Sequence, residues 1–189
     1  LTIPLIGTQR TMLVAAAILA LAAAPLLGSK AAAGFAAAAA IAALILVPPG
    51  VVKAEPGLIH EEESRYQFIQ VVERGPERWL YLNEGLAVHS VWRADSVFTG
   101  GEWDAFLTAP ALLGRTPHNI AILGNAGGTT GRALGVYYPE THVDGVEIDP
   151  SVSAVGQEYF GLGDNPNVTV HDADARPFLR ASDERYDLI

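Results

Sequence analysis

The sequence has no cysteine among its 189 residues and only five histidines. Without cysteine the chain forms no disulfide, offers no thiolate nucleophile and cannot ligate zinc through sulfur. No histidine has the spacing to Asp, Glu or another His that metal ligation requires; the five are His60, His89, His118, His142 and His171. We therefore predict no metal site, and no Ser-His-Asp arrangement is readable either.

Basic residues are also scarce, with 12 Lys and Arg against 21 Asp and Glu and a net charge of −9. The first 50 residues hold only Arg10 and Lys30, so residues 51–189 carry 10 basic and 21 acidic side chains, a net charge of −11. Nucleic acids are bound mainly through Lys and Arg contacts to phosphate. The composition therefore argues against a nucleic-acid partner and suits a cationic substrate.

Charge is almost missing from residues 1–50, where two uncharged apolar runs of 18 residues cover 11–28 and 31–48. As a helix, each run would be roughly 27 Å long, close to a hydrocarbon core of ~30 Å. Residues 1–50 are therefore predicted to be transmembrane helices in contact with membrane lipid. A buried helical pair in a soluble protein is the alternative, because alanine dominates both runs.

The basic residues around these runs predict an orientation. Arg10 and Lys53 fall on one side of the predicted helices and Lys30 on the other, and positively charged ends stay in the cytoplasm. This places the domain that follows in the cytoplasm, as part of a multi-pass protein of the cell membrane. The sequence begins within a hydrophobic stretch and without methionine, so we expect residues 1–50 to end a longer multi-pass segment.

Pro48-Pro49-Gly50 ends the second run, and the rest of the chain divides into three parts. Residues 51–64 are predicted to be a polar linker. Residues 65–115 form a small β subdomain, because short branched and aromatic runs there alternate with turn signals and predict an antiparallel element. Residues 116–189 alternate short strands with helices, which is typical of a parallel α/β sheet of Rossmann type.

A glycine-rich segment follows the first strand of this sheet, over residues 124–131. Glycines at that place let the backbone approach a ligand closely, with the amides of the next helix facing it. Glu147 ends the second strand, where a carboxylate accepts hydrogen bonds from both ribose hydroxyls. The nearest dinucleotide frame is Ala126, Gly128 and Gly131, one glycine short, which favours an S-adenosylmethionine-type ligand over NAD.

A second acidic residue, Asp174, follows the third strand. A carboxylate there can accept a hydrogen bond from the exocyclic amine of adenine. Either acid alone is more often a solvated loop residue, and the glycine loop alone fits an unrelated tight turn. Together, an acid at the end of the second strand and one after the third are typical of S-adenosylmethionine-binding folds.

These motifs resemble the spermidine synthases (polyamine aminopropyltransferases). The resemblance covers residues 64–189 and rests on Tyr66-Gln67 and on residues 124–131, 146–149, 174–179 and 186–189. The apolar segment before this domain is similar to the membrane-fused bacterial branch of the family. The resemblance implies an S-adenosylmethionine-methyltransferase-like Rossmann domain that follows a small antiparallel β domain, and homodimers.

The family moves an aminopropyl group from decarboxylated S-adenosylmethionine to putrescine, with spermidine and methylthioadenosine as products. The resemblance implies a donor site at Gln67, Gly124, Gly128, Glu147, Asp174 and Ala175. In that site Glu147 would hold the ribose, while Asp174 and the backbone of Ala175 would read the adenine. No cofactor would be tightly bound, because the decarboxylated S-adenosylmethionine is a co-substrate.

The departures from the family pattern concern the amine side. The aspartate of the family's glycine loop falls on Gly127, and the family's amine-side histidine falls on Trp103, with Asp104 as a substitute for the neighbouring glutamate. His89 lies near a polar substrate contact of the family, although a surface histidine on a strand is the simpler interpretation. The catalytic aspartate would follow Ile189, so residues 1–189 alone are expected to be inactive.

Two other functions stay open from the residues alone. The loss of the loop aspartate at Gly127 suits an S-adenosylmethionine-dependent methyltransferase on the same scaffold. The two changed amine-side positions also suit a non-catalytic domain that senses a nucleoside or polyamine for a membrane transporter. A dinucleotide enzyme would have to bind NAD despite Ala126.

Overall fold

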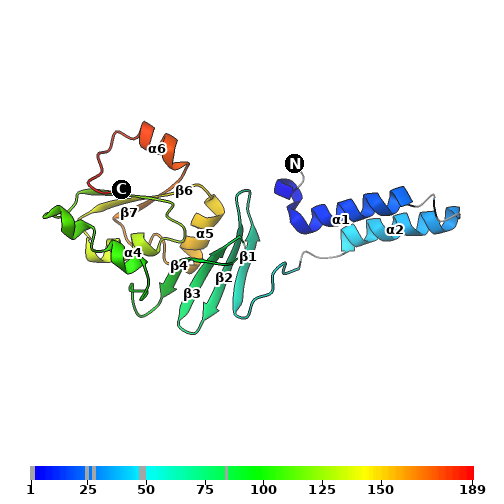
Figure 1. Ribbon diagram of the computed structural model, residues 1–189, viewed down its shortest axis with the longest axis horizontal. Coiled ribbons are helices and arrows are strands. Elements are labelled where there is room, and N and C mark those ends of the chain that lie inside the picture. Colours follow the sequence, from blue (N-terminus) through cyan, green and yellow to red (C-terminus); the bar gives the residue numbers. More distant parts are fainter. Residues whose placement is uncertain (1–2, 24–25, 27–28, 47–49, 84) are drawn as a thin grey trace. The chain divides into compact units, whose positions relative to one another are not determined.

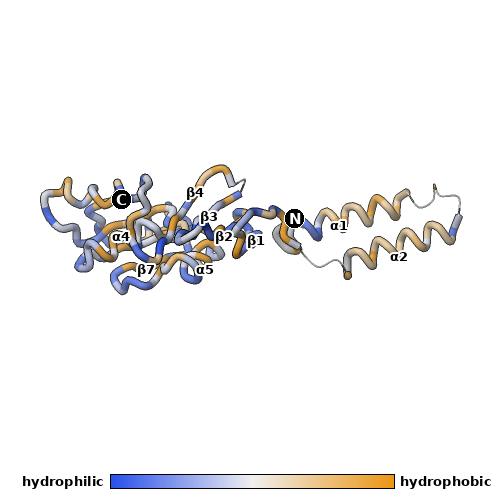
Figure 2. Tube along the Cα trace, turned by 90° about the horizontal axis from the view of Figure 1, so that it is seen from below, coloured by the Kyte–Doolittle hydropathy of each residue, from blue (hydrophilic) through white to orange (hydrophobic). Residues whose placement is uncertain are grey.

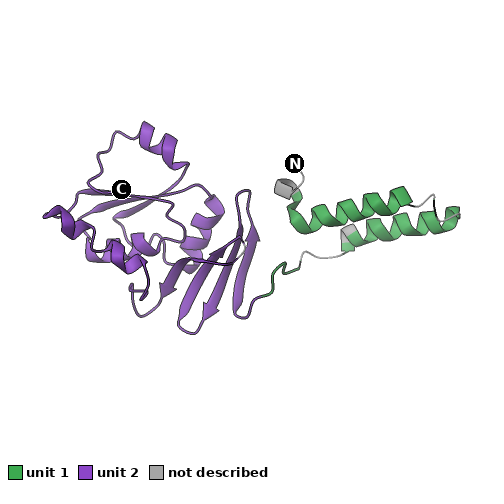
Figure 3. Cartoon of the chain, viewed as in Figure 1, with its two compact units in different colours: residues 1–54 green, residues 55–189 purple. Residues whose placement is uncertain are grey.

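The computed structural model describes residues 3–23, 26, 29–46, 50–83 and 85–189. The chain divides into two compact units, residues 1–54 and residues 55–189 (Figure 3). The first unit holds the apolar runs, and the second holds all the positions that the sequence motifs single out. Each unit is described by itself below.

The first unit contains two helices that lie side by side, α1 (Ile3–Ala23) and α2 (Lys30–Leu46) (Figure 1). Gly7 interrupts α1 with a φ of 78°, a left-handed conformation that glycine adopts at little energetic cost. Ser29 caps α2, because its backbone oxygen accepts from the Ala33 amide at 3.1 Å and its Oγ from the Ala32 amide at 3.4 Å. Apolar side chains of both helices are exposed, and both are coloured as hydrophobic in Figure 2.

Among the described helices, α1 alone is long and apolar enough to cross a membrane, with a mean hydropathy of 1.5 over Ile6–Ala23. The apolar stretch Lys30–Ala43 of α2 is shorter than a full span. The ends of the two predicted runs, residues 27–28 and 47–48, lie outside the described residues, as does the predicted Pro48-Pro49 break. One apolar helix is therefore established, and a transmembrane pair is a proposal.

The second unit opens with a four-stranded antiparallel sheet in the order β1-β2-β3-β4. Its strands are β1 (Leu58–Glu63), β2 (Phe68–Arg74), β3 (Glu77–Leu82) and β4 (Val88–Arg93). The antiparallel element predicted between residues 65 and 93 is present as β2 to β4. The sequence also predicts a turn at Asn83-Glu84-Gly85, and Glu84 of this turn lies outside the described residues.

Strand β1 lies inside the segment that the sequence predicts to be a linker, residues 51–64, so the linker ends earlier than predicted. The three glutamates of β1 have low strand propensity, which hid the strand from a pattern reading. They are stabilised by polar partners on neighbouring elements. Glu61 accepts from Gln70 Nε2 at 3.1 Å, and Glu62 accepts from Ser151 Oγ at 2.6 Å.

A short helical segment joins the two sheets. The sequence predicts one helix over residues 103–113, but the structure has α3 (Trp103–Phe106) and a separate 3₁₀ turn, η2 (Pro110–Leu113). Pro110 has no amide hydrogen to continue an α-helix, and it begins the second piece. Gly114 ends the segment with a φ of 67°.

The remaining chain forms a parallel sheet in the order β5-β6-β7 with helices between the strands (Figure 1). Its elements are β5 (Asn119–Leu123), α4 (Thr129–Tyr137), β6 (His142–Glu147), α5 (Pro150–Tyr159), β7 (Val168–Asp172) and α6 (Ala175–Ala181). The sequence also predicts a fourth strand over residues 186–189, and the structure has a single parallel bridge there, between Leu188 and Ile120. It lies on the other side of β5 from β6, so the strand order reverses at β5.

Asp187 anchors this fourth segment to the start of β5. Its carboxylate pairs with Arg115 and accepts from the His118 amide at 2.6 Å. The hydrogen bond from Arg115 and the one from the His118 backbone hold the pKa of Asp187 well below its ordinary value. The carboxylate therefore stays ionised and keeps the segment beside β5 across the whole physiological range of pH.

Two apolar cores hold the second unit together. In the first, Ile69, Val71, Leu80 and Leu82 of the antiparallel sheet pack on Val152, Val155 and Phe160 in and after α5. In the second, Ile120, Leu134, Val143 and Val168 join α4 to the parallel sheet. The first core fixes the antiparallel sheet against the α5 side of the parallel sheet, which brings the β1–β2 turn to the end of β6.

Candidate functional site

The carboxyl ends of β5, β6 and β7 lie next to one another, because the three strands are parallel and in direct register. The strand order reverses at β5, and open α/β sheets bind ligands outside the carboxyl ends at such a point. The glycine loop over residues 124–128 follows β5, Glu147 ends β6, and Asp174 lies two residues beyond β7. We call these residues the carboxyl edge.

The glycine loop turns sharply over the end of β6. The amides of Gly124 and Asn125 both donate to the Val146 carbonyl oxygen, at 2.9 and 3.0 Å. Gly124 and Gly128 have φ values of 85° and 88°, and Gly128 begins α4 as its N-cap. Ala126 also has a positive φ, of 47°. Only a few non-glycine residues adopt this conformation, so the loop holds a constrained backbone at the predicted ligand site.

Glu147 is buried and ties the loop to β6. Its Oε2 accepts from the Ala126 amide at 2.9 Å, and its Oε1 accepts from the Asp149 amide at 3.1 Å. An ionised carboxylate has about four acceptor positions, so two are left for a ligand hydroxyl. The side chain that the family resemblance assigns to the ribose therefore also fixes the loop.

Asp174 caps α6, with its Oδ1 accepting from the Arg176 amide at 2.9 Å. The Ala173 amide donates to the Glu147 carbonyl oxygen at 2.8 Å, which keeps the start of α6 next to the end of β6. Asp174 is exposed, and Ala175 is the first residue of α6. The structure thus brings Glu147, Asp174 and Ala175 to one edge, as the sequence predicts.

Gln67 reaches the same edge through Ser64, a residue that sequence reasoning missed. Ser64 Oγ accepts from the Gln67 amide at 2.9 Å and donates to Asp149 Oδ2. Asp149 is almost fully buried and lies two residues after Glu147. A serine three residues before Gln67 is typical of a side-chain-closed turn, which is the signal that would have found it.

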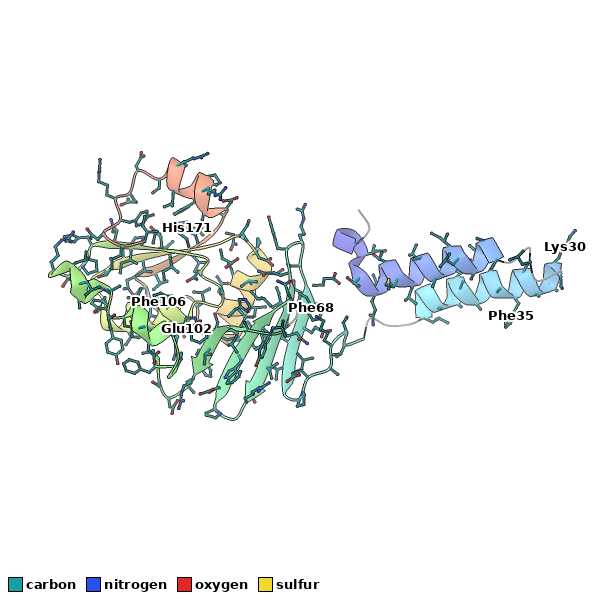
Figure 4. All side chains as sticks on the ribbon, viewed as in Figure 1. Lys30, Phe35, Phe68, Glu102, Phe106 and His171 are labelled. Atoms are coloured by element: carbon teal, nitrogen blue, oxygen red, sulfur yellow. The ribbon has the colours of Figure 1, made fainter. Side chains whose placement is uncertain are left out.

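A cavity of about 520 Å³ opens beside the glycine loop, between β4, α3, η2, β5 and α4. Its lining includes His89, Trp103, Gly124, Ala126 and Ile189, all of which the sequence motifs single out. Phe106, labelled in Figure 4, and Asn125 line it as well. Gln67, Glu147, Asp174 and Asp104 do not line it. The cavity therefore shares the start of the glycine loop with the carboxyl edge, whereas Gln67, Glu147 and Asp174 lie outside its lining.

Asp104 is turned away from this cavity. Its Oδ1 accepts from the Thr99 amide at 2.9 Å and from Thr99 Oγ1 at 3.0 Å, and its Oδ2 accepts from the Gly100 amide at 2.9 Å. The carboxylate closes the turn before α3. Its predicted role as a substitute for the family's glutamate has no support from this arrangement and stays a prediction.

A polar cluster occupies the start of β6 and the middle of β7, away from the carboxyl edge. Asp144 Oδ1 lies 2.6 Å from His171 Nε2 and 3.1 Å from His142 Nε2, and Tyr186 donates to Oδ2 at 2.9 Å. Burial raises the pKa of Asp144, but the hydrogen bonds from His171 and Tyr186 outweigh it and leave the pKa below its ordinary value. His171 is labelled in Figure 4.

Comparisons with known proteins point to the family that the motifs resemble. The chain is 38% identical over 136 residues to a probable polyamine aminopropyl transferase of Bifidobacterium longum (strain NCC 2705), covering 71% of this chain and 30% of that protein. It is 33% identical over 141 residues to the polyamine aminopropyltransferase of Vibrio vulnificus (strain CMCP6), covering 70% of this chain and 46% of that protein. The chain belongs to the polyamine aminopropyltransferase (spermidine synthase) family.

Solved structures of spermidine synthases share the fold. The structure of a probable spermidine synthase from Corynebacterium glutamicum ATCC 13032 matches with a TM-score of 0.54 and 18% identity, over 68% of this chain and 48% of that one. A spermidine synthase in complex with the transition state analogue AdoDATO matches with a TM-score of 0.53 and 18% identity, over 69% of this chain and 46% of that one. The predicted α/β fold with an antiparallel sheet before a Rossmann-like domain is thereby confirmed.

The spermidine synthase relatives are longer than this chain, which spans less than half the length of the two curated relatives above. No family model matches the chain. A shorter match is to a mouse protein named eEF1A lysine and N-terminal methyltransferase, at 32% identity over 75 residues, covering 40% of this chain and 11% of that protein. The roles assigned to individual residues stay predictions.

Proposed function

We propose that this spermidine synthase family member takes part in aminopropyl transfer from decarboxylated S-adenosylmethionine to an amine such as putrescine. The observation that carries the proposal is the carboxyl edge, where a glycine loop and two carboxylates meet at the point of strand reversal. Glu147 would hold the ribose, Asp174 and the Ala175 backbone would read the adenine, and the Gln67 turn would border the donor.

The chemistry asks the protein mainly to position two molecules. The amine nitrogen bonds to the aminopropyl carbon beside the sulfonium, while the bond from that carbon to sulfur breaks. The electron pair of the broken bond goes to sulfur and yields neutral methylthioadenosine, and the amine loses a proton to a base. Orientation of the two reactants and removal of that proton therefore supply most of the rate.

The proposal is tested in the full-length protein that carries this chain, by chromatography of methylthioadenosine after incubation with decarboxylated S-adenosylmethionine and amines. We expect release, and we expect Asp174→Asn to lower the affinity for methylthioadenosine by about 10-fold or more, since a hydrogen bond to a charged group is worth about 1.5–3 kcal/mol. Asp183→Asn makes the same change of charge at an exposed position outside the carboxyl edge and should leave that affinity unchanged. Absence of both binding and release would rule out the proposal.

Methyl transfer is the second candidate, because the match to the mouse methyltransferase covers 75 residues at 32% identity. The same carboxyl edge would then hold S-adenosylmethionine itself. Calorimetry separates the two functions, since a methyltransferase should bind S-adenosylmethionine more tightly than its decarboxylated form. The reverse order would exclude methyl transfer.

We further propose that the first unit anchors the protein in the cell membrane, with residues 55–189 in the cytoplasm and the protein crossing the membrane several times. The length and hydropathy of α1 support the anchor, and the positions of Arg10, Lys30 and Lys53 support the orientation. Because residues 1–189 contain no cysteine, Ser29→Cys and Asp183→Cys each add one thiol to this part of the protein for labelling by an impermeant maleimide, with the unmodified protein as the control for any other thiol. Ser29→Cys should react in intact cells, and Asp183→Cys only after lysis. The opposite result would reverse the orientation.

Homodimerisation, which the family resemblance implies, is a prediction that analytical ultracentrifugation can test.

A further inference from the structure

The antiparallel sheet meets the glycine loop along one edge of β4. This strand is the last of its sheet and pairs with β3, and it lies beside α4 (Figure 1). The outer edge of a terminal strand carries backbone amides and carbonyl oxygens that need partners when they are buried. On β4 these partners come from the elements that border the proposed donor site.

All five backbone amides of the glycine loop, residues 124–128, donate hydrogen bonds within the described part of the chain. Four of them have acceptors in β6 or in the loop itself, at 2.9–3.0 Å: the Val146 carbonyl oxygen, which accepts twice, Glu147 Oε2 and the Asn125 carbonyl oxygen. The amide of Gly127 instead donates to Ser90 Oγ of β4, at 2.9 Å. Ser90 therefore connects the loop to the other sheet of the unit.

Ser90 and Gly127 are packed tightly against each other. Ser90 is 1% exposed, and Gly127 is buried as well. A Cβ added to Gly127 would lie only 3.0 Å from both Cβ and Oγ of Ser90, so glycine is what lets the loop amide reach the hydroxyl. Loss of that hydroxyl would leave the Gly127 amide buried without its acceptor, which is costly for a hydrogen-bond donor.

Thr129, the first residue of α4, extends this connection along β4. Its Oγ1 accepts from the Val91 amide at 2.9 Å and donates to the Val91 carbonyl oxygen at 3.0 Å. One hydroxyl thus satisfies both backbone groups of a strand residue. Arg132, on the next turn of α4, donates to the carbonyl oxygens of Arg93 and Ser96 at 3.0 and 3.1 Å. The position of β4 along α4 is therefore fixed at successive points.

The two sides of this connection line the same cavity. His89 and Ser90 belong to its β4 wall, and residues 124–126 belong to its loop wall. A shift of β4 along α4 would change the distance between the walls, and with it the alignment of a molecule held there with one held at the carboxyl edge. For two bound reactants, a misplacement of about 1 Å can cost about 100-fold in rate.

We propose that Ser90 and Thr129 are positioning residues, which hold β4 in register with the glycine loop so that the amine meets the donor in a reactive geometry. This inference rests on the proposed transferase function. Both hydroxyls act through backbone groups of the loop and of β4, so their loss should lower turnover more than it weakens donor binding. A role in stability alone would leave the turnover of the folded protein unchanged.

Kinetics and calorimetry of the full-length protein separate these two roles. Ser90→Ala removes the acceptor of the Gly127 amide, and we expect kcat for methylthioadenosine release with putrescine to fall by about tenfold or more. The Kd for methylthioadenosine should rise by less than about threefold, because Glu147 and Asp174 are unchanged.

Ser153→Ala is the matched control for this substitution. Ser153 is 3% exposed on α5, and its Oγ has no hydrogen-bond partner among the described residues. The control therefore removes a buried serine hydroxyl without the loss of a hydrogen bond, and its kcat should stay near that of the wild type. Equal kcat values for Ser90→Ala and Ser153→Ala, measured well below both Tm values, would overturn the inference.

Thr129 provides a second pair of variants should Ser90→Ala fail to fold. Thr129→Val keeps the shape of the side chain but loses both hydrogen bonds to Val91, and kcat should fall by about tenfold. Thr129→Ser keeps the hydroxyl, and its kcat should stay within about threefold of the wild type. If the valine and serine variants have the same kcat, the hydroxyl does not position β4 and the inference falls.

Hydrogen exchange keeps the inference separate from the proposed function, because it needs no turnover. Peptides that cover residues 124–131 should exchange about tenfold faster in Ser90→Ala than in Ser153→Ala, since the loop opens more easily without its bond to β4. Equal exchange would show that Ser90 does not hold the loop. Failure of the wild type to bind or release methylthioadenosine would reject the transferase function, whereas normal release with an unchanged kcat in Ser90→Ala would reject the positioning role alone.

Discussion

The carboxyl edge and the cavity beside it are neighbours in the same unit, yet they are built differently. At the edge, each predicted donor carboxylate is anchored to backbone amides: Glu147 to Ala126 and Asp149, and Asp174 to Arg176. In the cavity, the amine-side positions that line the wall are His89 and Trp103, and most of the other lining residues are apolar. The carboxylates predicted for the donor are therefore present at the edge, whereas the described cavity wall holds no Asp or Glu.

The difference follows from what each region is made of. The edge lies at the ends of parallel strands, so its geometry is set by the register of the sheet and by glycine turns that tolerate few substitutions. The cavity wall is shared between β5, the glycine loop and α4 on one side and β4 with the irregular α3–η2 segment on the other. Only the second side can change a side chain without moving the parallel sheet, so we expect the proposed donor site to tolerate fewer substitutions than that part of the wall.

The largest effect is expected from Gly128→Ala, which changes the glycine loop of the carboxyl edge and should destabilise the fold. Gly128 has a φ of 88°, and an added Cβ would lie 2.5 Å from Leu162 Cδ1. Left-handed strain and overpacking together should lower the free energy of unfolding by about 2–4 kcal/mol. Gly163→Ala is the matched control, since its φ is 102° with nothing within 4 Å of the new carbon. Urea denaturation should show a smaller loss of unfolding free energy for Gly163→Ala than for Gly128→Ala. Equal losses would show that the contact with Leu162 does not add to the destabilisation.

Glu147→Gln tests whether the binding of the donor can be weakened without a change in the binding of the acceptor amine. The amide keeps the shape but loses the charge that accepts from the Ala126 and Asp149 amides and, by prediction, from the ribose. We expect the Kd for methylthioadenosine to rise by about 10- to 100-fold, as for a lost hydrogen bond to a charged group. The Kd for putrescine should not change.

Calorimetry measures both quantities in the Glu147→Gln protein. Glu140→Gln, at an exposed position between α4 and β6, serves as the control for the change in charge. A change in putrescine affinity without a change in methylthioadenosine affinity would contradict the assignment of Glu147 to the donor.

Much of the carboxyl edge could be predicted from the sequence, because its signals are local. A glycine run after an apolar strand and an acid at the end of the next strand have fixed positions relative to the sheet, and Glu147 and Asp174 fall where they were expected. The long-range contacts that hold this edge in place were not predictable from the sequence. The bond from Ser64 to Asp149 joins residues 85 positions apart, and no local pattern encodes such a contact.

The misassigned segments share a different physical cause. Strand β1 was hidden because its polar, glutamate-rich sequence is stabilised by tertiary partners such as Ser151 rather than by strand propensity. Asp104 was expected on the amine side, but short-range hydrogen bonds to Thr99 and Gly100 determine its direction. The cluster around Asp144 was also missed, because its histidines lie on different strands and come together only through the parallel register.

The Asp144 cluster gives a pH-dependent effect that is independent of both regions. The pKa of the Asp144 carboxyl is below the ordinary value of about 3.9 in the folded protein. The contribution of this carboxylate to stability is therefore present above about pH 3.9 and is lost as the pH falls through the folded pKa. Asp144→Asn should therefore lower the Tm more at pH 7 than at pH 3. His142, His171, Tyr186 and Glu184 face the same pocket and are unchanged in the variant.

Thermal unfolding of the Asp144→Asn protein at the two pH values measures this effect, with Asp183→Asn as an exposed control. The control should show a small difference from the wild type that does not grow between pH 3 and pH 7. A larger destabilisation by Asp144→Asn at pH 3 than at pH 7 would show that the carboxylate is not the stabilising form.

The smallest effect is expected from His89→Ala, which removes the one titratable side chain among the described residues of the cavity wall. His89 is exposed on β4, so water replaces most of its contacts and the change in KM for putrescine should be only about two- to threefold, as for a solvent-exposed hydrogen bond. The Kd for methylthioadenosine should stay the same, because His89 lies outside the carboxyl edge. Steady-state kinetics and calorimetry on one preparation measure both values. A tenfold or larger rise in KM would instead make His89 a main contact of the amine, and the contrast between a polar edge and an apolar cavity would no longer hold.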